Sequence, residues 1–176
     1  MIYSLRTAAC LLLLISLLPT TWAQRRGDPL TPQEGDQLRE AAQVPAERIK
    51  LYIDFSRARL AALEKMRADP KTANRPRQTH DQLQNFLDVY DELNDNIETF
   101  VERKADLRKP LKGVIDADTE FQARLRALKS SIDSSKEETS QYEFILNSLI
   151  ESVDSAAQDH RQLLSEQEEA FKHKKK

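Results

Sequence analysis

The sequence predicts an all-α protein: an antiparallel, coiled-coil-like bundle of two long helical hairpins, preceded by a short N-terminal helix. Charged residues make up 32% of the 176 residues and glycines number only three, which argues against barrels and sandwiches, since these need many turns. Apolar residues recur at spacings of three and four over most of the chain, which is typical of amphipathic helices. Blocks of basic and acidic residues also alternate along the chain.

Residues 1–23 have the pattern of a cleaved secretory signal peptide. Arg6 precedes an apolar run over 8–18, and Thr21-Trp22-Ala23 places small residues at both positions that signal peptidase reads. The run holds 11 residues, whereas a membrane-spanning helix needs about 20. We therefore expect cleavage before Gln24 and no stable membrane insertion afterwards, with an uncleaved anchor as the alternative.

The chain that remains after cleavage contains no cysteine, because Cys10 is the only one. No disulfide can form, so packing alone must stabilise the fold in an oxidising compartment. The sequence also lacks an Asn-x-Ser/Thr glycosylation site. These features favour a bacterial periplasmic or secreted protein. Residues 24–30, with Gly27 and Pro29, are expected to form a flexible lead-in.

Residues 31–176 are expected to form one helical domain that begins with a short helix over 31–44. Thr31 suits the N-cap, Pro32 the first helical position, and Glu34 can reach back to the N-cap amide. This helix should end by Val44, because a residue before proline is driven out of helical geometry.

The first hairpin is predicted to join helices over 45–68 and 79–108. Between them, residues 69–77 contain Pro70 and Pro76 and should form the loop. The second of these helices carries one apolar stripe with spacings of three and four: Leu83, Phe86, Tyr90, Leu93, Ile97 and Phe100.

The second hairpin is predicted to join helices over 110–132 and 135–172. The serine-rich stretch 130–135 separates them, and Ser134 with Glu137 or Ser135 with Glu138 offers a new capping box. Two alternatives stay open. Pro110 either opens the first helix or kinks a longer one. The heptad pattern also continues through the serines, which would allow one unbroken helix from Pro110 onward.

The charge blocks predict which helices pair. Residues 48–77 hold nine basic and three acidic residues, and 81–102 hold seven acidic residues and no basic one. Residues 103–129 hold eight basic and four acidic residues, and 133–169 hold ten acidic and two basic ones. Helices of opposite sign joined by short loops should pair antiparallel, with apolar stripes supplying the stability and charges selecting the partner.

The helix over 45–68 is apolar on two sides, and the second side is our candidate partner-binding face. This face consists of Leu51, Phe55, Ala58 and Ala62. A helix that is apolar on two sides either lies centrally in a bundle or shares one side with a partner. We expect the central position by a small margin.

Few residues suggest chemistry, and we predict no catalytic, cofactor-binding or metal-binding residue. The glycines are scattered, and there is no Gly-x-Ser-x-Gly elbow and no Glu-x-x-His pair. His160 falls on an apolar stripe, where a packed, hydrogen-bonded core histidine is expected. One acidic face could attract calcium or a cationic partner, although a solvated face opposite the basic helix is favoured: Asp88, Asp91, Asp95, Glu98 and Glu102.

We therefore expect an exported, non-enzymatic structural or protein-interaction module that binds a protein partner or itself, and not nucleic acid. The alternative is a periplasmic holdase-like chaperone with flexible amphipathic surfaces. A metal- or haem-binding bundle is a third possibility. A haem site would have to use Met66 with His80 or His160, and no ligand spacing supports one.

Overall fold

The computed structural model describes residues 28–131 and 140–173, and these residues contain five helices and no strand. The all-α class is thereby confirmed. The helices are α2 (Pro32–Glu40), α3 (Pro45–Ala68), α4 (Arg75–Glu102), α5 (Arg108–Ser131) and α7 (Glu143–His173). Within the described part of the chain, no helix combines the length and the apolar character needed to cross a membrane.

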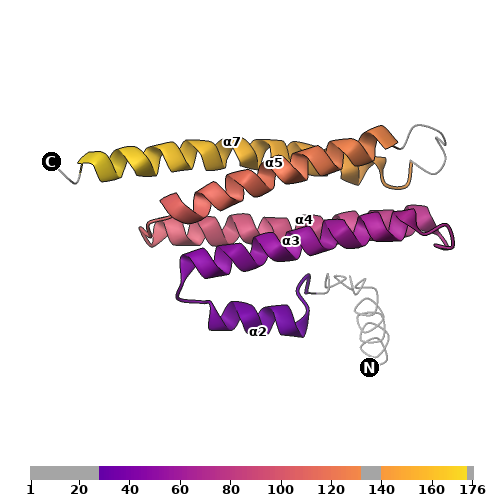
Figure 1. Ribbon diagram of the computed structural model, residues 1–176, viewed down its shortest axis with the longest axis horizontal. Coiled ribbons are helices and arrows are strands. Elements are labelled where there is room, and N and C mark those ends of the chain that lie inside the picture. Colours follow the sequence, from indigo (N-terminus) through magenta and orange to yellow (C-terminus); the bar gives the residue numbers. More distant parts are fainter. Residues whose placement is uncertain (1–27, 132–139, 174–176) are drawn as a thin grey trace, which may run out of the picture.

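The four long helices form a bundle of two antiparallel hairpins, as predicted (Figure 1). α3 and α4 form one layer, and α5 and α7 form the other. Between the layers, α3 packs beside α5 and α4 packs beside α7, and each of these pairs runs in the same direction. The short helix α2 packs mainly against α3. α3 is therefore the central helix of the first hairpin.

The boundaries of α2 and α4 differ from the prediction, whereas those of α3 do not. α2 ends at Glu40 rather than Val44, because the N–H groups of Ala41 and Ala42 close a final turn and Val44 is extended before proline. α4 begins at Arg75 rather than at 79, since Pro76 fits the first turn, where no backbone N–H is required. α3 has the predicted bounds.

α4 ends at Glu102, six residues before the predicted end. Lys104 has a φ of 58°, in the left-handed region, and this reverses the chain after the last turn of the helix. α5 then begins at Arg108, with Pro110 in its first turn. The reversal excludes one long kinked helix through Pro110.

α7 begins at Glu143, eight residues later than the predicted helix over 135–172. The preceding described residues, 140–142, form a turn, and the carbonyl of the buried Tyr142 accepts a bond from the N–H of Leu146. Since α5 and α7 are antiparallel, an unbroken helix from Pro110 is also excluded. The signal peptide, most of the lead-in, both capping pairs after Ser131 and the last three lysines lie outside the described residues.

The core forms where the apolar stripes of the four long helices meet. Its centre is an aromatic cluster that joins the two layers: Phe86 and Tyr90 of α4 lie with ring centroids 5.8 Å apart, and Phe121 of α5 packs edge-on against both. These three side chains are fully buried. Rings in such contacts contribute beyond their buried area, so this cluster fixes the two hairpins against each other.

The expected ion pairs are present in the second hairpin, and α3 also directs cations to helices other than α4. α5 and α7 are joined by Arg126 with Asp154 and by Lys112 with Glu168. The ion pairs that α3 makes with other helices lead to α2 and α5, as in Arg57 with Glu120 at 2.8 Å. Two other α3 cations do face α4, but they donate to neutral groups: Arg48 to Asn96 Oδ1 at 2.6 Å and Arg67 to Thr79 Oγ1 at 3.0 Å.

A partly buried ion pair holds α2 against α3. The guanidinium of Arg59 donates to both carboxylate oxygens of Glu34, at 2.9 and 2.7 Å, and also to the carbonyl of Pro29. Arg48, eleven residues earlier on α3, donates to the carbonyl of Leu38 at 2.5 Å. Phe55 lies on the same side of α3 as these two arginines, so α2 lies over the side of α3 that carries Phe55.

Acidification should loosen α2 before the rest of the bundle. Burial acts to raise the pKa of Glu34, but hydrogen bonds from Arg59 and from Thr31 outweigh it, and the pKa is lowered below its usual value of 4.5. The stabilisation is therefore present above that value and lost as the pH falls below it. We expect the protection factor of the Leu38 amide, which compares its hydrogen exchange with that of an unfolded chain at the same pH, to fall about 5- to 30-fold, corresponding to about 1–2 kcal/mol. Glu34→Gln should show the lower protection factor already at neutral pH, and this factor should change little with pH. Equal protection factors in both proteins at all pH values would contradict this role.

Candidate functional site

A groove of about 670 Å³ lies between α4 and α7. α4 contributes four residues at positions i, i+3, i+4 and i+7, and α7 contributes six that likewise share one face: Asn94, Ile97, Glu98, Val101, Ser152, Ser155, Ala156, Asp159, His160 and Leu163. Small side chains on α7 face larger ones on α4 across this seam, and this leaves the space open. The result is a groove with apolar walls and a polar rim.

The groove lies between the two acidic helices. The exposed carboxylates of Glu98 and Asp159 form its rim, and neither has an ion-pair partner among the described residues. Five ion pairs between helices each involve α3 or α5: Arg57–Glu120, Arg59–Glu34, Lys112–Glu168, Arg124–Glu64 and Arg126–Asp154. Like charges on two neighbouring helices repel each other, so the acidic side chains of α4 and α7 oppose close packing of this pair.

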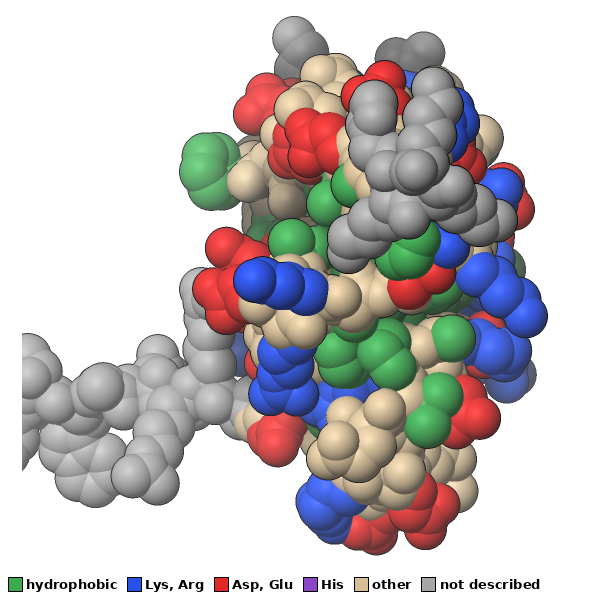
Figure 2. All heavy atoms as spheres, turned by 90° about the vertical axis from the view of Figure 1, so that its left-hand side faces the viewer, with side chains coloured by type: hydrophobic (Ala, Val, Ile, Leu, Met, Phe, Trp, Pro, Cys, Tyr) green, Lys and Arg blue, Asp and Glu red, His purple; other side chains and the backbone are tan. Residues whose placement is uncertain are grey.

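Acidic and basic side chains both occur around the end of the bundle, with hydrophobic side chains between them (Figure 2). Between the layers, helices of like predominant charge are neighbours, α3 with α5 and α4 with α7.

One buried polar atom in the groove has no partner. The side-chain oxygen Oδ1 of Asn94 is shielded from solvent and accepts no hydrogen bond within the described residues. An unpaired buried acceptor costs about 1–3 kcal/mol of stability. The groove thus contains an acceptor without a donor.

A buried hydrogen-bonded network lies beneath the groove and joins α4, α5 and α7. Asp118 is fully buried, and its two oxygens face different groups: Oδ1 accepts from the hydroxyl of Tyr90 at 2.8 Å, and Oδ2 lies 2.9 Å from Nδ1 of His160. Burial first, and then the charge of Asp118, raise the pKa of Tyr90 well above its usual value, so its hydroxyl stays protonated and donates. The network satisfies polar groups that would otherwise be costly in the core.

The network also sets the orientation of His160. Nδ1 of the imidazole lies 2.9 Å from Oδ2 of Asp118, and this contact holds the ring in place. His160 is 5% exposed and lines the groove. Among the described residues, Nε2 accepts no hydrogen bond, and neither Ser152 nor Ser155 donates to it. Among the described residues, no nucleophile is therefore paired with His160.

The structure separates the four residues of the sequence-predicted partner face. Phe55 is buried and its ring lies edge-on to that of Tyr52, and Leu51 is half-buried against the core. Ala58 and Ala62 are exposed. These four residues do not form one open apolar surface, because α2 occupies the side of α3 that carries Phe55.

The other candidate residues from the sequence lie apart from the groove or only partly within it. Of the acidic face on α4, Glu98 reaches the groove. His80 is close to Asp81, with Nδ1 3.2 Å from its carboxylate, and Met66 is half-buried against the core. Within residues 28–131 and 140–173, no group of three or more metal-ligating side chains comes together.

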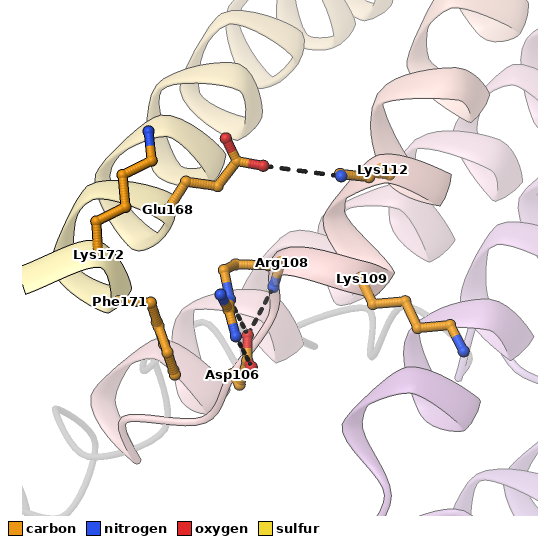
Figure 3. Close-up of a pocket in the computed structure, with 7 residues that line it drawn as sticks. All are labelled: Asp106, Arg108, Lys109, Lys112, Glu168, Phe171 and Lys172. Atoms are coloured by element: carbon orange, nitrogen blue, oxygen red, sulfur yellow. Dashed lines mark hydrogen bonds and ion pairs between the residues drawn. The ribbon is translucent and has the colours of Figure 1, made fainter. Parts of the chain in front are cut away.

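A second pocket, of about 550 Å³, lies where α5 begins and α7 ends, but its cations do not converge (Figure 3). Arg108 binds Asp106 through two nitrogens, which lowers the pKa of Asp106 to about 2, and its guanidinium stacks 3.7 Å from the ring centroid of Phe171. Lys112 faces Glu168, whereas Lys109 and Lys172 point away from the pocket centre. This arrangement ties the helix ends together.

Sequence reasoning found His160 but missed Asp118 and the groove. A signal for Asp118 exists, because it continues the spacing of Leu111 and Val114 toward Phe121 and so occupies a core position of α5. The groove had no comparable signal, since it depends on which helices become neighbours between the two hairpins.

The fold and the site define a class: a helical bundle of two antiparallel hairpins with an acidic, apolar-walled groove between parallel neighbours. Comparison with known protein families, curated proteins and solved structures found no match. The function must therefore be argued from the groove itself.

Proposed function

We propose that this protein is an exported, non-enzymatic protein-interaction module whose partner docks in the groove between α4 and α7. The observation that carries the proposal is the groove itself, which combines apolar walls, an acidic rim and one buried acceptor without a donor, Asn94 Oδ1. Such a surface provides apolar area for affinity and polar groups for orientation.

Two further features support an interaction module. Beneath the groove, the Tyr90–Asp118–His160 network connects three helices, so the groove walls are held by a rigid core. The apolar run and small-residue site over residues 1–23 support export, and the mature chain would then contain no cysteine to oxidise outside the cytoplasm.

Site-specific crosslinking tests this proposal. A photoreactive side chain at the exposed Ser155, inside the groove, should give one adduct with a protein partner, and its yield should saturate as the partner concentration rises. The matched control is the same photoreactive side chain at Ala62, which is also exposed but lies on α3. We expect no adduct from this second position.

Each other result would contradict the proposal. An adduct from Ala62 alone would place the partner on the face of α3. Many adducts from both positions would indicate a holdase-like chaperone with several clients. No adduct from Ser155, in cells that contain the partner at its native level, would remove the groove from consideration.

A further inference from the structure

We infer that the occupant of the α4–α7 groove is an amphipathic α-helix with a basic polar face, supplied by a partner protein. This inference rests on the proposed function and names the chemistry of its partner. It follows from the length of the groove, its apolar walls and its charge.

The groove has the dimensions of a helix-binding site. Its α4 wall runs from Asn94 to Val101 and its α7 wall from Ser152 to Leu163, about 10 and 16 Å at the helical rise per residue. An occupant of about three helical turns fits this length. Two helices already flank the groove, so a third can lie along the seam with an apolar face toward Ile97.

The charge of the groove rim favours a basic partner. Glu98 and Asp159 are exposed on opposite walls and have no ion-pair partner in the described residues. A cation that lies between the walls would relieve their mutual repulsion as well as gain its own attraction. The carboxylates of Glu98 and Asp159 are thus the groups that the cations of a bound basic helix would neutralise.

Binding of designed peptides to the purified protein tests the inference. The probe is an 18-residue helix-forming peptide with leucine on one face and lysine on the other. The two comparison peptides have glutamate in place of lysine, or the same leucines and lysines in an order that has no apolar face. We expect the leucine–lysine helix to bind at least 10-fold more tightly than either, with the difference shrinking at high salt.

Two variants connect this binding to the groove. Glu98→Gln with Asp159→Asn should weaken the leucine–lysine helix about 5- to 30-fold at low ionic strength. The matched control, Glu151→Gln with Glu169→Gln, makes the same charge change at exposed α7 positions outside the groove and should alter affinity less than twofold.

The outcomes separate the inference from the proposed function. Equal weakening by the rim variant and its control, or equal binding of the lysine and glutamate peptides, would overturn the inference. If crosslinking from Ser155 still gave a single adduct in that case, the groove would remain an interaction site, but its partner would not be a basic helix. Concentration-dependent dimerisation that Ser155→Arg abolishes would show that a second copy is the occupant, and would also overturn the inference.

Discussion

Asp118→Ala should destabilise the bundle by about 3–5 kcal/mol, because it removes the acceptor shared by two buried groups. The Tyr90 hydroxyl and Nδ1 of His160 would both lose their partner in a part of the core with almost no solvent access. A cavity at the former carboxylate adds to the cost. Urea unfolding monitored by far-ultraviolet circular dichroism measures the loss.

A combined variant shows whether the loss comes from orphaned polar groups. Tyr90→Phe, Asp118→Leu and His160→Leu together replace the network by apolar side chains. This variant should recover most of the stability that Asp118→Ala loses, since apolar replacement of a whole buried network is often neutral. If Asp118→Ala alone matched the wild type in urea, the network would have no structural role.

Phe55→Ala, combined with Leu51→Ala, should also cost several kcal/mol, of which Phe55 contributes about 3–5 kcal/mol. Phe55 is 7% exposed and lies on the α2 side of α3, and Leu51 is half-buried. The same variant should leave crosslinking through Ser155 unchanged under conditions in which it stays folded, because these residues lie on a different helix from the groove.

The matched control lies on the same predicted face. Ala58→Gln and Ala62→Gln change exposed positions of α3 and should each alter stability by no more than about 0.5 kcal/mol. Thermal and urea unfolding of the four proteins compare the two halves of the face. A double alanine variant that keeps wild-type stability but loses its partner would make α3 the binding site and contradict the groove.

The helices themselves follow from local sequence. The apolar spacing of three and four along α4 and α5, the Thr31–Glu34 capping box and the placement of prolines in first turns all act within a few residues of one another. Helix ends were harder to predict. At Lys104 a left-handed backbone ends α4 early, and nothing in the local residues demands it.

The site could be predicted only in part. The position of His160 on an apolar stripe predicted burial, because the helical period reports which side chains point inward. Its partner is 42 residues away on another helix, and a periodic pattern does not say which helix lies opposite. The candidate face on α3 had the same difficulty, since two apolar sides are compatible with either a second neighbour or a partner.

The sequence alone determined the class of the fold, the hairpin pairing of helices that follow one another along the chain, and the separation of charge among them. Only the tertiary structure decided how the two hairpins meet. That choice places acidic α4 beside acidic α7 and thereby creates the groove, and it also places α2 over Phe55. The physical reason is that helix formation and short-loop pairing depend on neighbours in the chain, whereas contact between hairpins depends on how complete side-chain surfaces fit in the core.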